Sequence, residues 1–181
     1  MNDKELSNLD LDYLYSICNI DSDYKPQSVN IISTYDKDKI NDQDSLENKN
    51  VDIFKNNGHC IIYHAWKTEG AHWLTLLRNK KNEVIIFDSL GNKEGMMQDK
   101  KQFNLLLKRL KENGFKTIII NDKQYQGNSN CCGKYAIFAI ALNKLFKGVN
   151  IDQIHNHLEK HSSKNKNYDS YILKLFSKEN I

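Results

Sequence analysis

The stretch QGNSNCCGKYAIFAIAL, residues 126–142, is a polar loop with two adjacent cysteines and a glycine, followed by an apolar run. Apolar residues recur in the run at helical spacing, as at Tyr135, Phe138 and Leu142, and most positions between them are apolar too. A helix that is apolar almost all round is typical of the centre of a fold. We therefore predict a buried central helix around which the rest of the chain packs.

The start of this helix is predicted to lie close to the cysteines, because Asn128, Ser129 and Asn130 are residue types that commonly cap helix N-termini. A thiol at that place lies near the positive end of the helix dipole, which stabilises the thiolate and lowers the pKa of the thiol. Such a cysteine can act as a nucleophile at neutral pH.

Of the two cysteines, Cys132 is the candidate nucleophile. Gly133, which has no side chain, lets a substrate backbone approach the residue before it. Gln126 lies near enough across the loop to donate an amide hydrogen bond. Cys131 is expected to be a neighbour that faces the core. The alternative is that the two cysteines are a buried pair of small hydrophobes, since a free cysteine is usually structural.

The composition indicates one domain spanning residues 1–181, because the length is ordinary for a domain and no Pro-, Gly- or Ser-rich linker divides the chain. The net charge of +3 permits contact with nucleic acid without arguing for it. No stretch approaches the roughly 18 to 20 apolar residues of a membrane span, and the start MNDKELSN is too polar for a secretion signal. Four cysteines, two of them adjacent, make a poor disulfide framework, so we expect a soluble protein of a reducing compartment.

The hydrophobic pattern also predicts the order of the other elements. An amphipathic helix is predicted over residues 4–18, and residues 21–57 are predicted to be surface loop with short docked pieces at 29–32 and 51–54. Three strands follow as an antiparallel meander, in HCIIYHAW (59–66), HWLTLLR (72–78) and EVIIFD (83–88). The remaining predictions are a helix at 98–113, a strand at 116–120, and two closing helices at 151–160 and 168–176. This order indicates an α+β fold with a mainly antiparallel or mixed sheet of about four or five strands flanked by helices.

His72 opens the second of these strands, and Asp88 ends the third. If the two strands pair as a hairpin, the beginning of one lies opposite the end of the next, so the two residues become neighbours. A carboxylate beside an imidazole fixes its orientation and stabilises the imidazolium, which a cysteine nucleophile needs from its base. Each residue also has an ordinary structural interpretation, as a satisfied strand histidine and as a turn-forming aspartate.

The other histidines are interpreted as structural, and no metal site is predicted. His155 and His157 lie two positions apart on a predicted helix, so they face different directions, and no cysteine pair at metal-ligand spacing accompanies them. The same structural interpretation applies to His59, His64 and His161.

Three segments together resemble the adenovirus-type maturation proteases, the viral branch of a cysteine-protease clan that also holds the SUMO-specific proteases. They are GAHWLTLL (70–77), FDSLG (87–91) and QGNSNCCG (126–133), and the resemblance extends to STYDK (33–37) and LEKHS (158–162). The order of His-Trp, an acidic residue after a strand, Gln and Cys-Gly is similar throughout. The resemblance implies an adenain-like cysteine protease fold, with the nucleophile at the N-terminus of the central helix.

The resemblance also implies a role for each residue that matches the family's motif. Cys132 corresponds to the nucleophile, His72 to the general base and Asp88 to the acidic third member. Gln126 corresponds to the donor that stabilises the oxyanion beside the Cys132 N–H. Trp73 is expected to pack beside these groups, or to be a strand core residue.

The function implied by the resemblance is that of a cysteine endopeptidase, which cleaves viral capsid precursors near small residues such as glycine during virion maturation. We expect a monomer that acts in the virion and the viral factory of the host cell, as in small double-stranded DNA viruses and virophage-like elements. The chemistry requires no cofactor, and DNA or a viral peptide is left open as an activator. A disulfide to that peptide is in doubt, because KTIIINDKQYQ (116–126) contains no cysteine.

Two alternatives stay open. The first is an isopeptidase that removes ubiquitin-like modifiers, because the family's SUMO-specific branch has Asp at the position of Asp88 and the same spacing from Gln126 to Cys132. The second is a non-catalytic DNA-binding or scaffold protein that keeps the fold. The presence of all four site residues argues against the second alternative.

Overall fold

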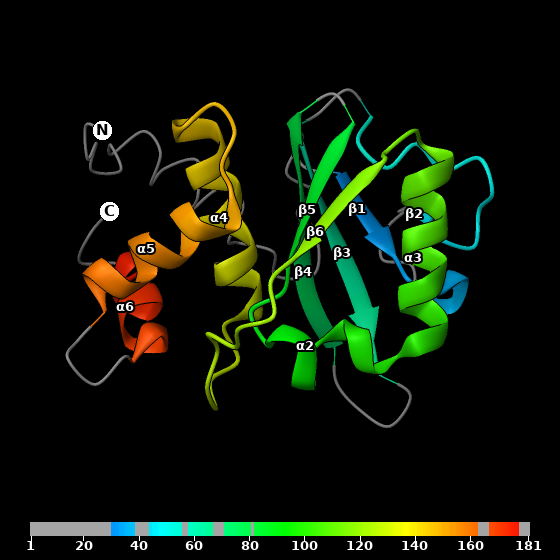
Figure 1. Cartoon of the computed structure of the whole chain (residues 1–181). Helices are drawn as coiled ribbons and strands as arrows, with labels where there is room; N and C mark the ends of the chain where they lie inside the picture. Colours follow the sequence, from blue (N-terminus) through cyan, green and yellow to red (C-terminus); the bar gives the residue numbers. More distant parts are fainter. Residues whose placement is uncertain are drawn as a thin grey trace.

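Six strands form one mixed sheet with helices on both of its faces (Figure 1). The computed structural model describes residues 30–38, 44–55, 58–66, 71–80, 82–162 and 167–177, and the helix predicted at 4–18 lies outside them. The strands are β1 Asn30–Ser33, β2 Asp44–Ser45, β3 His59–Ala65, β4 Ala71–Lys80, β5 Glu83–Phe87 and β6 Thr117–Ile120, and their order across the sheet is β2-β1-β3-β4-β5-β6.

The helices divide between the two faces of the sheet. In Figure 1, α4 lies on one face with α5 and α6 outside it, and α3 covers the other face. The α-helices are α2 Gly91–Glu94, α3 Lys100–Glu112, α4 Cys132–Leu145, α5 Ile151–His161 and α6 Tyr168–Leu175, with short 3₁₀ turns η1 Asp36–Asp38 and η2 Met96–Gln98. An α+β fold with a mixed sheet flanked by helices is therefore confirmed.

The predicted meander of β3, β4 and β5 is confirmed, because both strand pairs are antiparallel. Side chains of β4 alternate between the two faces, as strand geometry requires. Leu74 and Leu76 pack in the core on the α3 side, and Leu77 packs in the core on the α4 side. Both faces of the central strand are therefore buried.

The prediction of surface loop is wrong for β2, whereas residues 30–32 of the docked piece predicted at 29–32 belong to β1, a strand inside the sheet. All four residues of β1 are buried, and the strand pairs in parallel with β3 on one side and with β2 on the other. A strand buried on both faces lacks the polar alternation that identifies strands in sequence. The docked piece at 51–54 is confirmed, since Val51, Ile53 and Phe54 are buried and the Asn30 side chain donates to the Ile53 carbonyl at 2.6 Å.

The prediction that the central helix is buried all round is also confirmed. Residues 135–143 of α4 are all buried. The sheet covers one side of α4, and α5 and α6 cover the other (Figure 1), so no polar face is needed. Burying a large apolar side chain such as Phe138 contributes about 1.5–3 kcal/mol to the free energy of unfolding. Because α4 buries several such side chains, it stabilises the packing on its face of the sheet.

Candidate active site

His72 and Asp88 meet at the end of the sheet where β4 begins and β5 ends. Thr75 pairs with Phe87, so the same register places Asp88 opposite Leu74 and diagonally across from His72, on one face of the sheet. His72 Nε2 and Asp88 Oδ1 are 2.7 Å apart, and both side chains are buried, with 2% and 3% of each residue exposed. The neighbourhood expected from the hairpin is therefore present.

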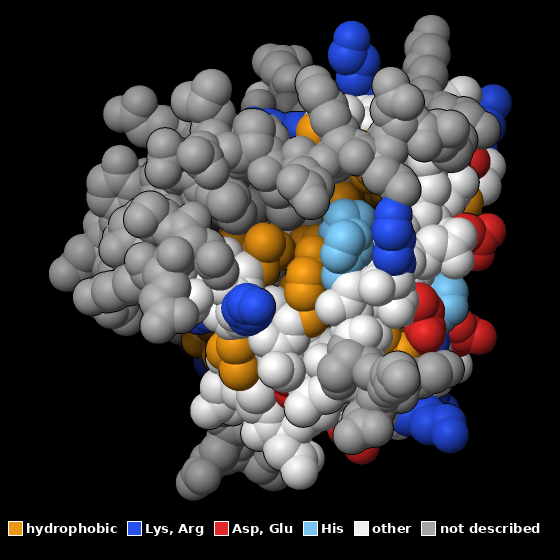
Figure 2. All heavy atoms as spheres, turned by 90° about the vertical axis from the view of Figure 1, so that its left-hand side faces the viewer, with side chains coloured by type: hydrophobic (Ala, Val, Ile, Leu, Met, Phe, Trp, Pro, Cys, Tyr) orange, Lys and Arg blue, Asp and Glu red, His pale blue; other side chains and the backbone are white. Residues whose placement is uncertain are grey.

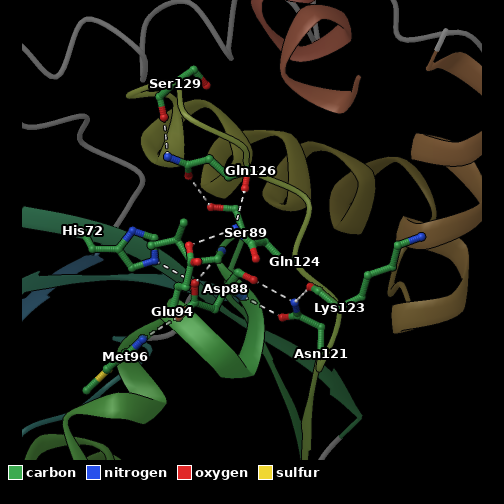
Figure 3. A network of polar contacts seen from close by, with 11 residues as sticks. His72, Asp88, Ser89, Glu94, Met96, Asn121, Lys123, Gln124, Gln126 and Ser129 are labelled. Atoms are coloured by element: carbon green, nitrogen blue, oxygen red, sulfur yellow. Dashed lines mark hydrogen bonds and ion pairs between the residues drawn. The ribbon is translucent and has the colours of Figure 1, made fainter. Parts of the chain in front are cut away.

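Backbone donors hold the Asp88 carboxylate in place. Its Oδ1 accepts from the Leu90 N–H and its Oδ2 from the Met96 N–H, both at 2.9 Å (Figure 3). Asn121, just after β6, brackets the backbone of Asp88 by accepting from its N–H and donating to its carbonyl, each at 2.7 Å. These bonds compensate for the burial of a charged group and fix the oxygen that faces His72.

Gly95 makes this arrangement sterically feasible. A Cβ atom built on Gly95 would lie 2.2 Å from Asp88 Oδ2 and 2.4 Å from the Gly91 carbonyl oxygen. No real Cβ approaches other heavy atoms so closely, so only glycine lets the turn after α2 close over the carboxylate.

Cys132 is the first residue of α4, and its side chain lines the same cavity as His72. Because Asp88 occupies Nε2 of the imidazole, Nδ1 is the nitrogen left for the thiol. The residue before the helix is Cys131, and no side chain caps the helix. The helix thus begins where it was predicted, but Asn128, Ser129 and Asn130 do not cap it.

The pKa values of the pair shift in opposite directions. Burial raises the pKa of Cys132, but the hydrogen bond and charge of His72 and the backbone N–H groups of Trp73 and Gly133 outweigh burial, so the net pKa is lowered. Burial lowers the pKa of His72, but hydrogen bonds and charges of Asp88 and Cys132 raise it to about 9. Both shifts favour a thiolate paired with an imidazolium.

Cys131 has a different environment. Its side chain is buried, as expected for a neighbour that faces the core, and burial raises its pKa to about 11. Its Sγ lies 2.8 Å from Ser129 Oγ. The structure therefore places Cys132, and not Cys131, in the thiolate-favouring environment beside the imidazole.

Gln126 faces the same space as Cys132. Its Oε1 accepts from Ser89 Oγ–H at 2.7 Å, and its Nε2 donates to the Ser129 carbonyl at 2.6 Å (Figure 3). A primary amide has two N–H donors, so one donor of Gln126 has no partner among the described residues. This second donor can serve an oxyanion.

A cavity of about 490 Å³ opens over these groups, and two tryptophans form part of its wall. Trp66 stacks on His72 with ring centroids 6.4 Å apart and meets His64 edge-on at 4.5 Å. Trp73 packs against Tyr63 at 4.8 Å, as expected for a side chain beside the site. The cavity is lined by Trp66, Ala71, His72, Trp73, Leu90, Gln126, Asn130, Cys132, Gly133, Lys134 and Ile137.

The remaining histidines make ordinary contacts. His59 and His64 are buried, and His155 lies against Tyr125 while His157 bonds Tyr171. Figure 2 shows the face on the α5 and α6 side, where histidine lies beside hydrophobic side chains and the Lys and Arg side chains lie apart from one another.

Within the described ranges, no group of three or more His, Cys, Asp or Glu residues is placed to hold a metal ion, and no helix is long and apolar enough to cross a membrane.

Three residues of the site, Trp66, Gly95 and Asn121, have no signal in the sequence pattern. Trp66 closes the run HCIIYHAW, which predicts a strand, and the pattern does not indicate that its ring covers His72. Gly95 and Asn121 act on Asp88 through contacts between segments that only the folded chain brings together.

Comparisons with known proteins give low structural similarity. The chain matches no protein-family model and no curated protein. The central domain of the uncharacterised Lpg1148 protein from Legionella pneumophila is 17% identical with a TM-score of 0.46, over 98% of this chain and 96% of that one. HopZ1a, in complex with IP6 and CoA, is 15% identical with a TM-score of 0.43, over 81% of this chain and 46% of that one.

A third similar structure is the C-terminal Ulp1 protease domain in complex with Smt3, the yeast ortholog of SUMO. It is 14% identical with a TM-score of 0.33, over 69% of this chain and 55% of that one. None of these TM-scores reaches 0.5, so the evidence for function is the geometry of the site and the sequence motifs.

Proposed function

We propose that the chain is a cysteine peptidase in which Cys132 is the nucleophile. The observation that supports this proposal is the line from the Asp88 carboxylate through the His72 imidazole to the Cys132 thiol at the start of a helix. A thiolate held by an imidazolium, with an oriented carboxylate behind it and amide donors beside it, is suited to acyl transfer.

In the proposed reaction, the Cys132 thiolate attacks the scissile carbonyl carbon and forms a C–S bond. The resulting oxyanion accepts from the second N–H of Gln126 and from the Cys132 N–H, and one such donor is commonly worth about 10²–10³ in rate. The His72 imidazolium protonates the leaving amine as the C–N bond breaks. His72 then takes a proton from water, whose oxygen attacks the thioester and releases the acid and the thiolate. Asp88 keeps the imidazole aligned in both steps.

For the substrate, we propose viral capsid precursors cleaved near small residues, with the virion or viral factory as the place of action. This part rests on the order of the His-Trp, FDSLG and Gln-to-Cys-Gly motifs. Activation by DNA or by a viral peptide belongs to the same proposal. The second candidate is an isopeptidase of ubiquitin-like modifiers, which Asp88 and the short loop from Gln126 to Cys132 favour.

Incubating the purified protein with capsid precursors from the same genome, and separately with ubiquitin-like modifier fusions, separates the two substrates. We expect cleavage of the precursors after a small residue, and a faster rate on adding DNA would support DNA as an activator. Cleavage confined to the modifier fusions would replace the viral substrate by the isopeptidase function. A protein that cleaves neither, and whose Cys132 alkylates no faster than an ordinary thiol, would contradict the peptidase proposal.

Substitution of Gly95 by alanine is expected to reduce kcat by about 10²-fold without touching the cavity. The added Cβ would displace the Asp88 carboxylate, since the two cannot stand 2.2 Å apart, and His72 would lose its orienting partner. Steady-state kinetics of Gly95→Ala measures the effect. The matched control is Gly58→Ala, because nothing lies nearer than 4.0 Å to a Cβ built there. Equal kcat values for the two variants would show that Asp88 is not held as described.

A further inference from the structure

Asp169 connects the C-terminal helix to the loop that carries the candidate nucleophile. The residue lies in the first turn of α6. Its Oδ2 accepts from the Gly127 N–H at 3.0 Å and from the Ser129 hydroxyl at 2.6 Å. Its Oδ1 accepts from the Tyr135 hydroxyl at 2.9 Å. One carboxylate thus binds the loop before α4 and the first turns of α4 itself.

These contacts lie between the two groups that would stabilise the oxyanion, the Gln126 amide and the Cys132 N–H, and just after the second of them. Gly127 and Ser129 lie between Gln126 and Cys132, and Tyr135 lies three residues after Cys132. The Ser129 carbonyl also accepts from Gln126 Nε2 at 2.6 Å (Figure 3). The Ser129 carbonyl, together with the Ser89 hydroxyl on Oε1, therefore orients the amide and its second N–H.

A carboxylate is the appropriate acceptor at this place. Two donors, the Gly127 N–H and the Ser129 hydroxyl, converge on Oδ2. The Tyr135 hydroxyl and, at 3.6 Å, the Cys131 thiol reach Oδ1, so every partner of the carboxylate is a donor. An amide at the same position would keep one acceptor and present an NH₂ group to donors. The isosteric substitution Asp169→Asn therefore breaks the hydrogen bonds to one of the two oxygens and leaves the shape of the side chain almost unchanged.

We propose that Asp169 is a positioning residue, which sets the geometry of the oxyanion hole from outside the cavity. The inference rests on the proposed function. It makes α6 part of the catalytic apparatus, because the loop from Gln126 to Cys132 keeps its shape only while Asp169 holds it. Asp169 does not touch substrate and acts through Ser129 and Gln126.

Asp169→Asn is expected to lower kcat about 10- to 100-fold with little change in KM, because the lost contact affects only the transition state. Alkylation of Cys132 by iodoacetamide is expected to keep the wild-type rate, because that displacement forms no oxyanion. The matched control is Asp152→Asn, since Asp152 holds the corresponding first-turn position of α5 and is exposed.

Ser129→Ala, which removes the hydroxyl and keeps the carbonyl, tests the connection independently. Asp169→Asn and Ser129→Ala are expected to combine less than additively in kcat, because both break the same contact. Additive losses would overturn the inference. An equal loss of hydrolysis and of alkylation in Asp169→Asn would also overturn it, since Asp169 would then support the whole site.

The two proposals fail in different ways. If the wild type hydrolyses its substrate and Asp169→Asn behaves like Asp152→Asn, only the role of Asp169 is rejected. If the wild type hydrolyses nothing and its Cys132 reacts like an ordinary thiol, the peptidase function is rejected, and the positioning role with it.

Discussion

Replacing Cys132 by alanine is expected to lower the rate of peptide hydrolysis by at least about 10⁴-fold and to leave the fold intact. Alanine cannot form the acyl-enzyme bond, and only the oxyanion donors and substrate binding remain to catalyse the reaction. The side chain is partly exposed at the cavity, so its loss leaves no buried void. Substrate turnover and thermal unfolding of Cys132→Ala measure both halves of the expectation.

The matched control is Cys131→Ala, which changes the adjacent thiol. Cys131 is buried and its thiol contacts Ser129 and Asp169 instead of His72, so its substitution is expected to reduce stability and to lower turnover far less than Cys132→Ala does. If Cys131→Ala loses hydrolysis while Cys132→Ala cleaves normally, the choice of nucleophile is wrong.

Asp88→Asn is the second large effect, with an expected loss of about 10²- to 10⁴-fold in kcat. The amide keeps the shape of the side chain but not the charge that stabilises the imidazolium of His72. The NH₂ group of the asparagine would also face a group that donates to the carboxylate in the wild type, either His72 or the Met96 N–H. Asp122→Asn, at an exposed aspartate that follows β6, is the control and is expected to retain wild-type turnover.

The pH dependence of kcat/KM tests whether Asp88 stabilises the imidazolium of His72. Activity needs a protonated His72, so it is present below the pKa of about 9 and is lost as pH rises through that value. Activity also needs the Cys132 thiolate, so it is lost on the acid side as pH falls through the lowered pKa of that thiol. In Asp88→Asn the pKa of His72 falls, and the alkaline limb moves to lower pH. An alkaline limb unchanged by the substitution would show that Asp88 does not stabilise the imidazolium.

The sequence predicts those parts of the fold whose pattern is visible within a few neighbouring residues, such as turns and helical periodicity. The three strands β3 to β5 are bounded by short turns, and α3 and α4 have clear helical periodicity. The apolar pattern at 29–32 predicts a docked piece, but the pairing of β1 has no local signal, because β1 pairs in parallel with β3, which begins 29 positions further along the chain. Parallel partners are joined by long connections, so nearby sequence does not reveal them.

The same distinction applies to the candidate site. The sequence predicts that His72 and Asp88 are neighbours, because a hairpin converts their spacing of 16 positions into a spatial contact. Asn121 contacts Asp88 across 33 positions, and Asp169 contacts Ser129 across 40. No hairpin relates these residues, so their contacts follow only from the packing of β6 and α6.

The central claim is that Cys132 is a thiolate nucleophile that accepts an acyl group from a peptide. The most direct test is to treat the wild type with a glycine-terminated peptidyl acyloxymethyl ketone and to locate the adduct by intact mass and peptide mapping. The predicted result is a single adduct on Cys132, formed far faster than on a free thiol and lost in His72→Ala. An adduct on another cysteine, or labelling of Cys132 no faster than that of a free thiol, would contradict the claim.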